Sequence, residues 1–267
     1  MLGAIAGDVI GSVFEFTGQK STDFPLFCRD SRYTDDTVMT AAVASALLDA
    51  RGYAEVFRDF GRRHPGRGYG GYFHRWLHDP AMGPYRSWGN GSAMRVSPVA
   101  RAFQSVDRVL EEARRSAEVT HDHAEGVRGA EAVALAVFLA LHGADKLEIK
   151  RKVAGHSHYS LDASVDEIRP TYSFDESCLG TVPQSIVCFL ESTDFEHAVR
   201  LAISLGGDAD TMACVAGAIA EAHYGSVPDE IAATVRGLLS ADLIDVVDRF
   251  RDRYPMPRRS EADAAAT

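Results

Sequence analysis

The sequence has little cysteine and no excess of positive charge, and each lack removes a class of protein. Its 267 residues include four cysteines, 28 Lys plus Arg and 38 Asp plus Glu, which gives a formal net charge of −10. Because the cysteines form no CxxC pair, neither a zinc knuckle nor a dense disulfide framework is expected. The acidic balance argues against a protein that binds nucleic acid through a basic surface.

Long apolar runs are also missing. The longest stretch without charge, histidine or glycine is 37–48, twelve residues, well short of the ~18 apolar residues that identify a membrane span. Asp8 interrupts the apolar N-terminal segment, and no basic residue precedes it, which does not fit a secretory signal. We therefore expect a cytoplasmic protein with no membrane partner.

What the sequence does contain is apolar residues at helical spacing. After Thr37, a stripe with a period of 3.6 includes Val38, Met39, Ala42 and Val43. No window offers several alternating β-branched strands, so the fold class is predicted to be all-α. The same spacing predicts further helices over 105–118, 125–141, 184–190, 195–205, 211–224, 228–239 and 241–254.

Loops are predicted at 18–32, 65–71, 79–90 and 157–180, and none has the composition of a linker between two folded units. The length is compatible with one or two domains. We predict a single domain over residues 1–256. Residues 257–267 are polar and rich in alanine, which is typical of a flexible tail.

Two acidic clusters precede apolar helices, Thr34-Asp35-Asp36-Thr37 and Gly206-Gly207-Asp208-Ala209-Asp210-Thr211. Taken singly, each fits a helix cap, since Thr and Asp side chains satisfy free N–H groups there. Together they supply four carboxylates and at least two hydroxyls, more than capping requires. These oxygens favour Mg²⁺ or Mn²⁺ over zinc, and four carboxylates would balance two divalent ions in charge.

Two further motifs each have a functional and a structural interpretation. Glycines in the segment Ser87-Trp88-Gly89-Asn90-Gly91-Ser92 would let backbone N–H groups approach a phosphate, but a plain Asn-Gly turn is equally compatible. His121-Asp122 resembles the HD pair of metal-dependent phosphohydrolases. A lone histidine near a helix start is more often a cap or a surface group.

Five segments, taken in order, resemble the ADP-ribosylglycohydrolase family and span nearly the whole chain. The segments are Gly3-Ala4-Ile5-Ala6-Gly7-Asp8-Val9-Ile10-Gly11-Ser12 with Glu15, then Tyr33-Thr34-Asp35-Asp36-Thr37, Gly89-Asn90-Gly91-Ser92-Ala93-Met94-Arg95, Thr120-His121, and Gly206-Gly207-Asp208-Ala209-Asp210-Thr211. The resemblance implies a compact orthogonal bundle of many helices around a central binuclear metal site. It also implies cleavage of the glycosidic bond between ADP-ribose and a modified acceptor, with ADP-ribose as product.

Carried over residue by residue, the resemblance implies two Mg²⁺ ions, with Mn²⁺ as an alternative. The implied metal ligands are Thr34, Asp35, Asp36, Asp208, Asp210 and Thr211. Asp35 or Asp210 would orient the attacking water. Glu15 would lie at the metal centre and pass a proton to the departing side chain, and the short segment after it corresponds to a flap over the scissile bond.

The resemblance also implies the residues that bind ADP-ribose, with Trp88 against adenine and His121 lining the cleft. The implied set is Ser87, Trp88, Gly89, Asn90, Gly91, Ser92 and His121. A protein side chain is the expected acceptor, and nucleic acid is a partner only if it is itself ADP-ribosylated. Two alternatives stay open, an HD-type phosphohydrolase and a non-catalytic ADP-ribose-binding module.

Overall fold

The computed structural model describes residues 1–256, and the predicted tail at 257–267 lies outside this range. Helices account for all the regular structure in the described part, apart from one isolated bridge between Gly89 and Ser177, so the all-α prediction is confirmed. The helices are α1 (Leu2–Gly11), α2 (Asp35–Asp49), α3 (Tyr53–Arg63), α4 (Gly71–His78), α5 (Gly91–Met94), α6 (Val99–Ala102), α7 (Val106–Glu118), α8 (Ala124–Leu141), α9 (Lys146–Ser157), α10 (Val165–Ile168), α11 (Cys178–Glu191), α12 (Phe195–Ile203), α13 (Ala209–Tyr224), α14 (Asp229–Leu238) and α15 (Ala241–Arg253).

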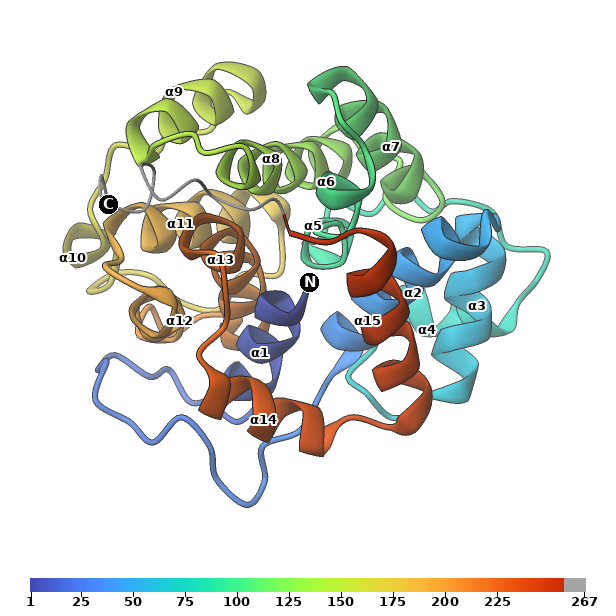
Figure 1. The fold of residues 1–267 in the computed structure, drawn as a ribbon, viewed down its shortest axis with the longest axis horizontal. Coiled ribbons are helices and arrows are strands. Elements are labelled where there is room, and N and C mark those ends of the chain that lie inside the picture. The colour runs from blue at the N-terminus through green and yellow to red at the C-terminus, as the bar shows by residue number, and fades with distance from the viewer. Residues whose placement is uncertain (257–267) are drawn as a thin grey trace.

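The centre of the bundle is the pair α1 and α13, with α2, α8, α11 and α12 around it (Figure 1). Both central helices are rich in glycine and alanine, and they pack with their backbones in contact. A Cβ on Gly7 would lie 2.0 Å from the carbonyl oxygen of Ala213, and one on Gly11 would lie 2.5 Å from Cα of Asp210. Only glycine therefore permits this approach, which sets α1 directly against the first turn of α13.

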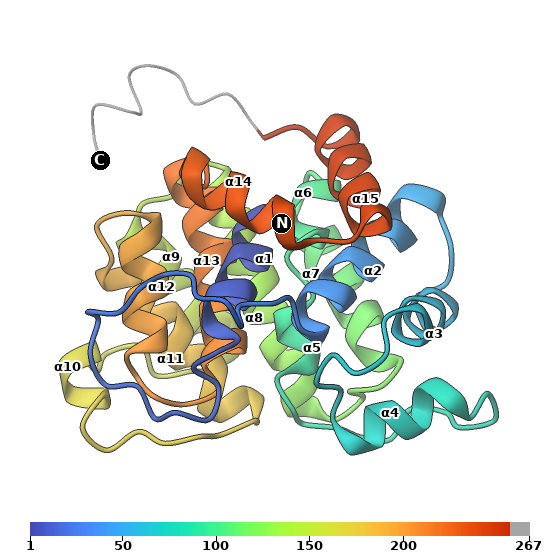
Figure 2. The ribbon, with the colours of Figure 1, turned by 90° about the horizontal axis from the view of Figure 1, so that it is seen from below.

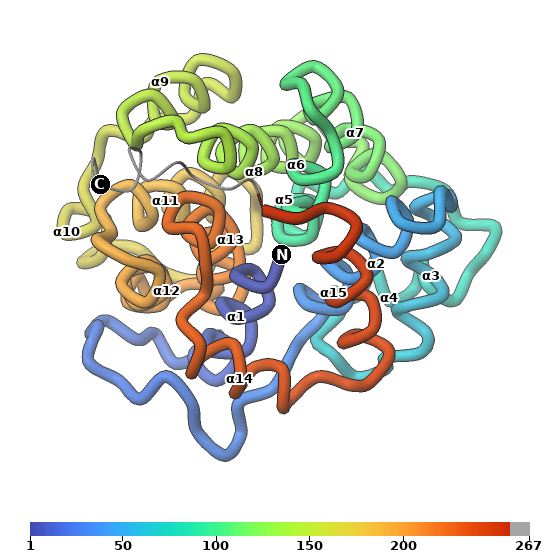
Figure 3. Tube along the Cα trace, viewed as in Figure 1, coloured from blue at the N-terminus to red at the C-terminus, as the bar shows by residue number. Residues whose placement is uncertain are grey.

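Several connecting segments gather at one edge of the bundle. Figure 2 shows α4 and the loop before α11 at the edge opposite α14 and α15. The segment between α1 and α2 is a long loop that extends outside the helices at the lower left of the view (Figure 3). Within residues 1–256, no helix has both the length and the apolar character that crossing a membrane needs.

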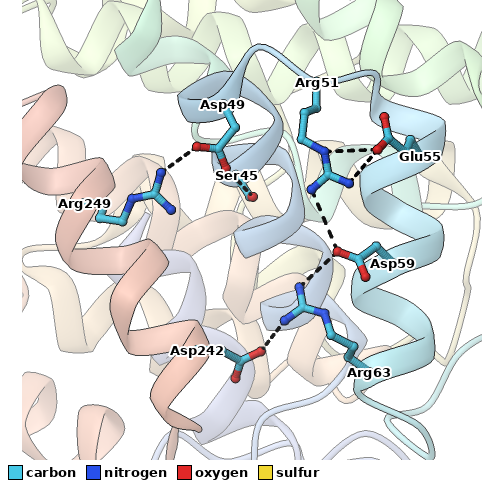
Figure 4. A network of polar contacts seen from close by, with 8 residues as sticks. All are labelled: Ser45, Asp49, Arg51, Glu55, Asp59, Arg63, Asp242 and Arg249. Carbon is cyan, nitrogen blue, oxygen red and sulfur yellow. Dashed lines mark hydrogen bonds and ion pairs between the residues drawn. The ribbon is translucent and has the colours of Figure 1, made fainter.

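An ion-pair network joins α2, α3 and α15 on the surface (Figure 4). Arg249 on α15 pairs with Asp49 on α2 at 2.5 Å, and Arg63 on α3 reaches Asp242 on α15 at 2.8 Å. Arg51, between α2 and α3, pairs with Glu55 at 2.7 Å. Because these side chains are partly exposed, each pair contributes about 0–1 kcal/mol. The network fixes the orientation of the outer helices more than it stabilises the fold.

Some predicted boundaries were wrong. Helix α1, which ends at Gly11 with Ser12 as its C-cap, was not among the predicted ranges, and Glu15 lies in the turn that follows it. The helix predicted from Gln184 begins at Cys178 and contains Pro183. A proline there leaves only the carbonyl of Leu179 without its helical donor, and Leu179 is exposed to water. Helices α3, α4 and α9 and the short helices α5, α6 and α10 were also absent from the predicted set, and α10 lies in the predicted loop 157–180.

Candidate active site

Three helices bring carboxylates together at the centre of the bundle. Asp8 comes from α1, Asp36 from the first turn of α2, and Asp210 from the first turn of α13. Each offers a carboxylate oxygen within 4.8 Å of the others, and all three side chains are buried. A second group of the same kind consists of Glu15, Asp208 and Asp210. Asp210 therefore belongs to both groups and links the two acidic clusters.

Asp8 is the site residue that sequence reasoning missed. Its carboxylate accepts hydrogen bonds from the backbone N–H of Thr34 at 3.0 Å and of Thr37 at 3.1 Å. It also accepts from both threonine hydroxyls, from Thr34 at 2.6 Å. These contacts fasten the start of α2 to α1. An acid in the middle of the otherwise apolar segment 2–11 was the signal that could have identified it.

Capping explains each acidic cluster only in part, and in the second cluster Asp210 accepts from the free N–H of Thr211 at 3.0 Å. Thr34 is the N-cap of α2, and its hydroxyl accepts from the N–H of Asp36 at 3.4 Å. Asp208 is the N-cap of α13 but makes no side-chain cap bond. Its carboxylate instead accepts from the side-chain amide of Asn90 at 2.7 Å. The two clusters therefore contain more carboxylates than capping uses, and the additional carboxylates face the interior of the site.

Burial and mutual repulsion raise the pKa values of the clustered acids. Burial, followed by repulsion from Asp210 and Asp8, raises the pKa values of Asp35 and Asp36 well above their usual range. Burial and then Asp208 do the same to the pKa of Asp210. Burial raises the pKa of Asp208 to about 6. A nearby cation would reverse this effect, because it favours the charged form of every carboxylate around it.

The donor set fits a hard divalent cation. One carboxylate oxygen of Asp36, Oδ1, is buried and has no hydrogen-bond partner among the described residues. Thr211 donates its hydroxyl to the other oxygen, Oδ2, at 3.3 Å. Carboxylate and hydroxyl oxygens are the ligands that Mg²⁺ and Mn²⁺ prefer. The acidic residues therefore cluster as a group that could hold metal ions.

Glu15 and Asp35 complete the acidic wall. Glu15 is half-buried, and desolvation, with a further contribution from Asp210, raises its pKa to about 7. Asp35 donates its backbone N–H to the carbonyl of Arg67 at 2.7 Å, which ties the start of α2 to the loop before α4. Both residues line a cavity of about 450 Å³.

This cavity brings together most residues of the predicted site. Those that line it are Glu15, Asp35, Asp36, Ser87, Trp88, Gly89, Asn90, Gly91, His121, Asp208, Asp210 and Thr211. Thr34 and Ser92 do not line it. Thr34 is turned toward Asp8, and Ser92 is fully buried and donates to the carbonyl of Gly126 at 2.6 Å. A contact of either side chain with a ligand would need a rotation.

The glycine-rich turn is partly engaged by the protein itself. The N–H of Gly89 donates to the Ser87 hydroxyl at 3.1 Å, and that of Asn90 donates to the carbonyl of Glu176 at 2.8 Å. The Asn90 amide also donates to Thr181 at 3.1 Å, besides Asp208. Asn90 therefore connects the turn to the acidic cluster, and phosphate binding by this turn stays a prediction.

Trp88 and His121 line the cavity beside the glycine-rich turn. Trp88 is 59% exposed, so its indole ring is open to a ligand. His123 is the N-cap of α8 and accepts from the N–H of Glu125 at 3.1 Å. His121 is buried beside the turn. Both acidic groups found among the described residues consist of Asp and Glu alone, so His121-Asp122 does not form the HD arrangement.

Comparisons with known proteins agree with this geometry. A family model described as ADP-ribosylglycohydrolase matches residues 1–260. The chain is 32% identical to ADP-ribosylhydrolase ARH3 of Danio rerio, over 98% of this chain and 91% of that protein. It is 27% identical to the ADP-ribosylarginine hydrolase Tri1 of Pseudomonas putida (strain GB-1), over 84% and 69% respectively. A solved structure titled ADP-ribosylglycohydrolase-related protein complex superposes with a TM-score of 0.69 and 25% identity over 96% of each chain.

Proposed function

The chain belongs to the ADP-ribosylglycohydrolase family, and we propose that it hydrolyses the glycosidic bond between ADP-ribose and a modified protein side chain. The observation that carries the proposal is the buried carboxylate cluster of α1, α2 and α13, which opens onto the cavity lined by Trp88 and the Gly89–Gly91 turn. One side of this cavity suits cations and ribose hydroxyls, and the other suits a base.

Two divalent cations, Mg²⁺ or Mn²⁺, are the proposed cofactors. The two sets of clustered acids, which have Asp210 in common, support the proposal of two ions. The proposed ligands are Asp35, Asp36, Asp208, Asp210 and Thr211, with Asp8 added by the structure and Thr34 if its hydroxyl turns. When bound, such ions would polarise ribose hydroxyls and make a nearby water more acidic.

The chain's own residues carry out the proton transfers and orient the substrate. Asp35 or Asp210 accepts a proton from the water that attacks the anomeric carbon, as a carboxylate does in glycoside hydrolysis generally. Glu15 is half-buried and lines the cavity beside Asp208 and Asp210. It is therefore suited to protonate the departing side chain. Trp88 and His121 orient the ADP-ribose portion at the far side of the cavity.

Two exposed phenylalanines beyond Glu15 support a polypeptide acceptor. Phe16 is 79% exposed and Phe174 is 45% exposed, and their ring centroids lie 5.5 Å apart. Lys20 already holds the two loops together, since it donates to the carbonyls of Arg169 at 2.9 Å and Tyr172 at 2.6 Å. Both rings are therefore available to contact the substrate polypeptide on either side of its modified residue.

The decisive experiment is hydrolysis of ADP-ribosyl-arginine and ADP-ribosyl-serine peptides in Mg²⁺, with release of free ADP-ribose as the readout. We expect turnover of at least one linkage, faster on the peptide than on the modified amino acid alone. Asp210→Asn should abolish turnover and weaken metal binding while the helical circular-dichroism signal is retained. Asp162→Asn, an exposed acid paired with Lys150, is the matched control and should behave like wild type.

Three results would contradict the proposal. Normal hydrolysis by chelated protein would exclude a role for the cations. Tight binding of ADP-ribose without turnover of any linkage would favour a binding module, and release of phosphate from nucleotides would favour a phosphohydrolase.

A further inference from the structure

Arg95 is a buried cation without a carboxylate partner. It is 1% exposed, and no ion pair to it exists among the described residues. One terminal nitrogen, Nη2, donates to the carbonyl of Ser116 at 2.8 Å and to the hydroxyl of Thr120 at 3.0 Å, and Nε has no partner. The guanidinium also lies over the ring of Phe57, 4.4 Å from its centroid, but a buried charge without an ion-pair partner is still costly. The position of Arg95 on the cavity lining indicates a functional reason for that cost.

The hydroxyl of Thr120 transmits the effect of Arg95 to His121. A guanidinium only donates hydrogen bonds, so Thr120 Oγ1 accepts from Arg95. The remaining partner of this fully buried hydroxyl is Nδ1 of His121, at 2.7 Å. If Nδ1 carried a proton and donated it, the hydroxyl hydrogen would have no acceptor among the described residues. The satisfied arrangement therefore has Thr120 donating to an unprotonated Nδ1.

The proton of the neutral imidazole then resides on Nε2, which faces the cavity. A Cβ on Gly91 would lie 3.1 Å from Nε2, and one on Gly89 would lie 3.8 Å away, so this nitrogen is beside the glycine-rich turn. No described residue accepts from it. Burial, reinforced by the charge of Arg95, lowers the pKa of His121 well below its usual range, which keeps the ring neutral.

We propose that Arg95 and Thr120 are positioning residues that hold His121 as the Nε2–H tautomer, with this N–H aimed at an anionic oxygen of the ligand beside the Gly89–Gly91 turn. The identity of the ligand as an ADP-ribose diphosphate rests on the proposed function, whereas the tautomer does not. A neutral donor backed by a fixed positive charge suits an anion without requiring His121 to change protonation.

The first test reads the tautomer directly, by nitrogen NMR of ¹⁵N-histidine-labelled protein without ligand. We expect wild-type His121 to show a proton-bearing Nε2 and a bare Nδ1. Thr120→Val removes the donor to Nδ1 and should shift the Nδ1 resonance to that of a bare nitrogen without a hydrogen bond, while Thr120→Ser should retain the wild-type pattern. Arg95→Met frees the hydroxyl to accept from Nδ1 and should give a tautomer mixture. A proton on Nδ1 in the wild type would overturn the proposal.

The second test measures ADP-ribose affinity by calorimetry in Mg²⁺. Thr120→Val should weaken binding about tenfold, the effect of one misdirected hydrogen bond, and Thr120→Ser should stay within about threefold. Thr40→Val, another buried threonine that donates to a backbone carbonyl, is the control for lost packing and should bind like wild type. Unchanged affinity in Thr120→Val would refute the donor role. A wild-type protein that carries the proton on Nε2 but does not bind ADP-ribose would instead refute the proposed function.

Discussion

At the residue scale, Glu15 differs from the other acids of the site. It is half-buried, lies just beyond the end of α1, and belongs to the carboxylate group of Asp208 and Asp210. The other members are held by hydrogen bonds or buried in helix starts, whereas no described side chain or backbone group is hydrogen-bonded to the Glu15 carboxylate. This leaves Glu15 as the acid best able to move toward a departing group.

We predict that Glu15→Gln keeps the fold and binds ADP-ribose within about threefold of wild type, while turnover falls by at least ~100-fold. The amide has the same shape but cannot carry a transferable proton. Steady-state kinetics and calorimetry on the same preparation separate the two effects. Normal turnover of every linkage by Glu15→Gln would show that Glu15 is only a solvated carboxylate.

Trp88 is expected to stack on adenine, because it lines the cavity and is 59% exposed. Stacking of a base on an aromatic ring contributes ~1–3 kcal/mol. Trp88→Ala should therefore weaken ADP-ribose binding roughly 5- to 150-fold, measured by calorimetry. Leu147→Ala, an exposed apolar residue on α9, is the control. Equal affinity in Trp88→Ala and wild type would place adenine elsewhere.

At the scale of elements, the contact between α1 and α13 decides whether the site exists. Asp8 reaches Asp36 and Asp210 only because Gly7 and Gly11 let the two helix backbones touch. Any side chain at these positions would separate the helices by pushing against backbone atoms, which cannot rotate away. The position of the carboxylate cluster and the core packing therefore depend on the same contact.

Gly7→Ala should accordingly destabilise the protein by about 3 kcal/mol or more, since its Cβ would overlap the Ala213 backbone. Gly155→Ala is the matched control, because a Cβ there meets no atom within 4 Å and Gly155 lies on the exposed side of α9. This control should gain about 0.5–1 kcal/mol. Urea unfolding followed by circular dichroism measures both. A Gly7→Ala protein as stable as wild type would show that α1 and α13 separate easily.

At the scale of the whole molecule, the buried acids make stability depend on pH and on cations. Their folded-state pKa values lie above those of the unfolded chain, so the folded protein binds more protons. Their contribution is favourable near pH 4 and is lost as the pH rises through the raised pKa values, which for Asp208 is about 6. Without cations, the site therefore opposes folding most above neutral pH.

Adding Mg²⁺ should raise Tm more at pH 8 than at pH 6, because cations and protons compete for the same oxygens. At a concentration of 100 times Kd the gain is about 2.7 kcal/mol, or roughly 5–10 °C for a chain of this size. Differential scanning fluorimetry with and without chelator measures it, and Asp210→Asn should reduce the gain at both pH values. The same gain at pH 6 and pH 8 would contradict this competition.

Local patterns in the sequence were sufficient to predict the all-α fold class and the acids that precede α2 and begin α13. The acids at 34–37 and 208–210 were recognisable because they exceed what capping uses, and the structure confirms that Asp208 makes no cap bond. The end of α1 was not recognisable, since Gly11 is followed by the apolar residues Val13 and Phe14 that could continue a helix. Pro183 similarly concealed the true start of α11.

The sequence by itself determined that the chain is helical, that two helices begin with surplus carboxylates, and that a glycine-rich turn lies between them. Only the tertiary structure decided that Asp8 joins these carboxylates, that Asn90 is hydrogen-bonded to Asp208, and that Ser92 faces the core. Helix starts follow from neighbouring residues, whose hydrogen bonds are local. The meeting of Asp8 with Asp210 depends on contacts between residues about two hundred positions apart, and the close approach of α1 and α13 that brings them together is a property of the packed core.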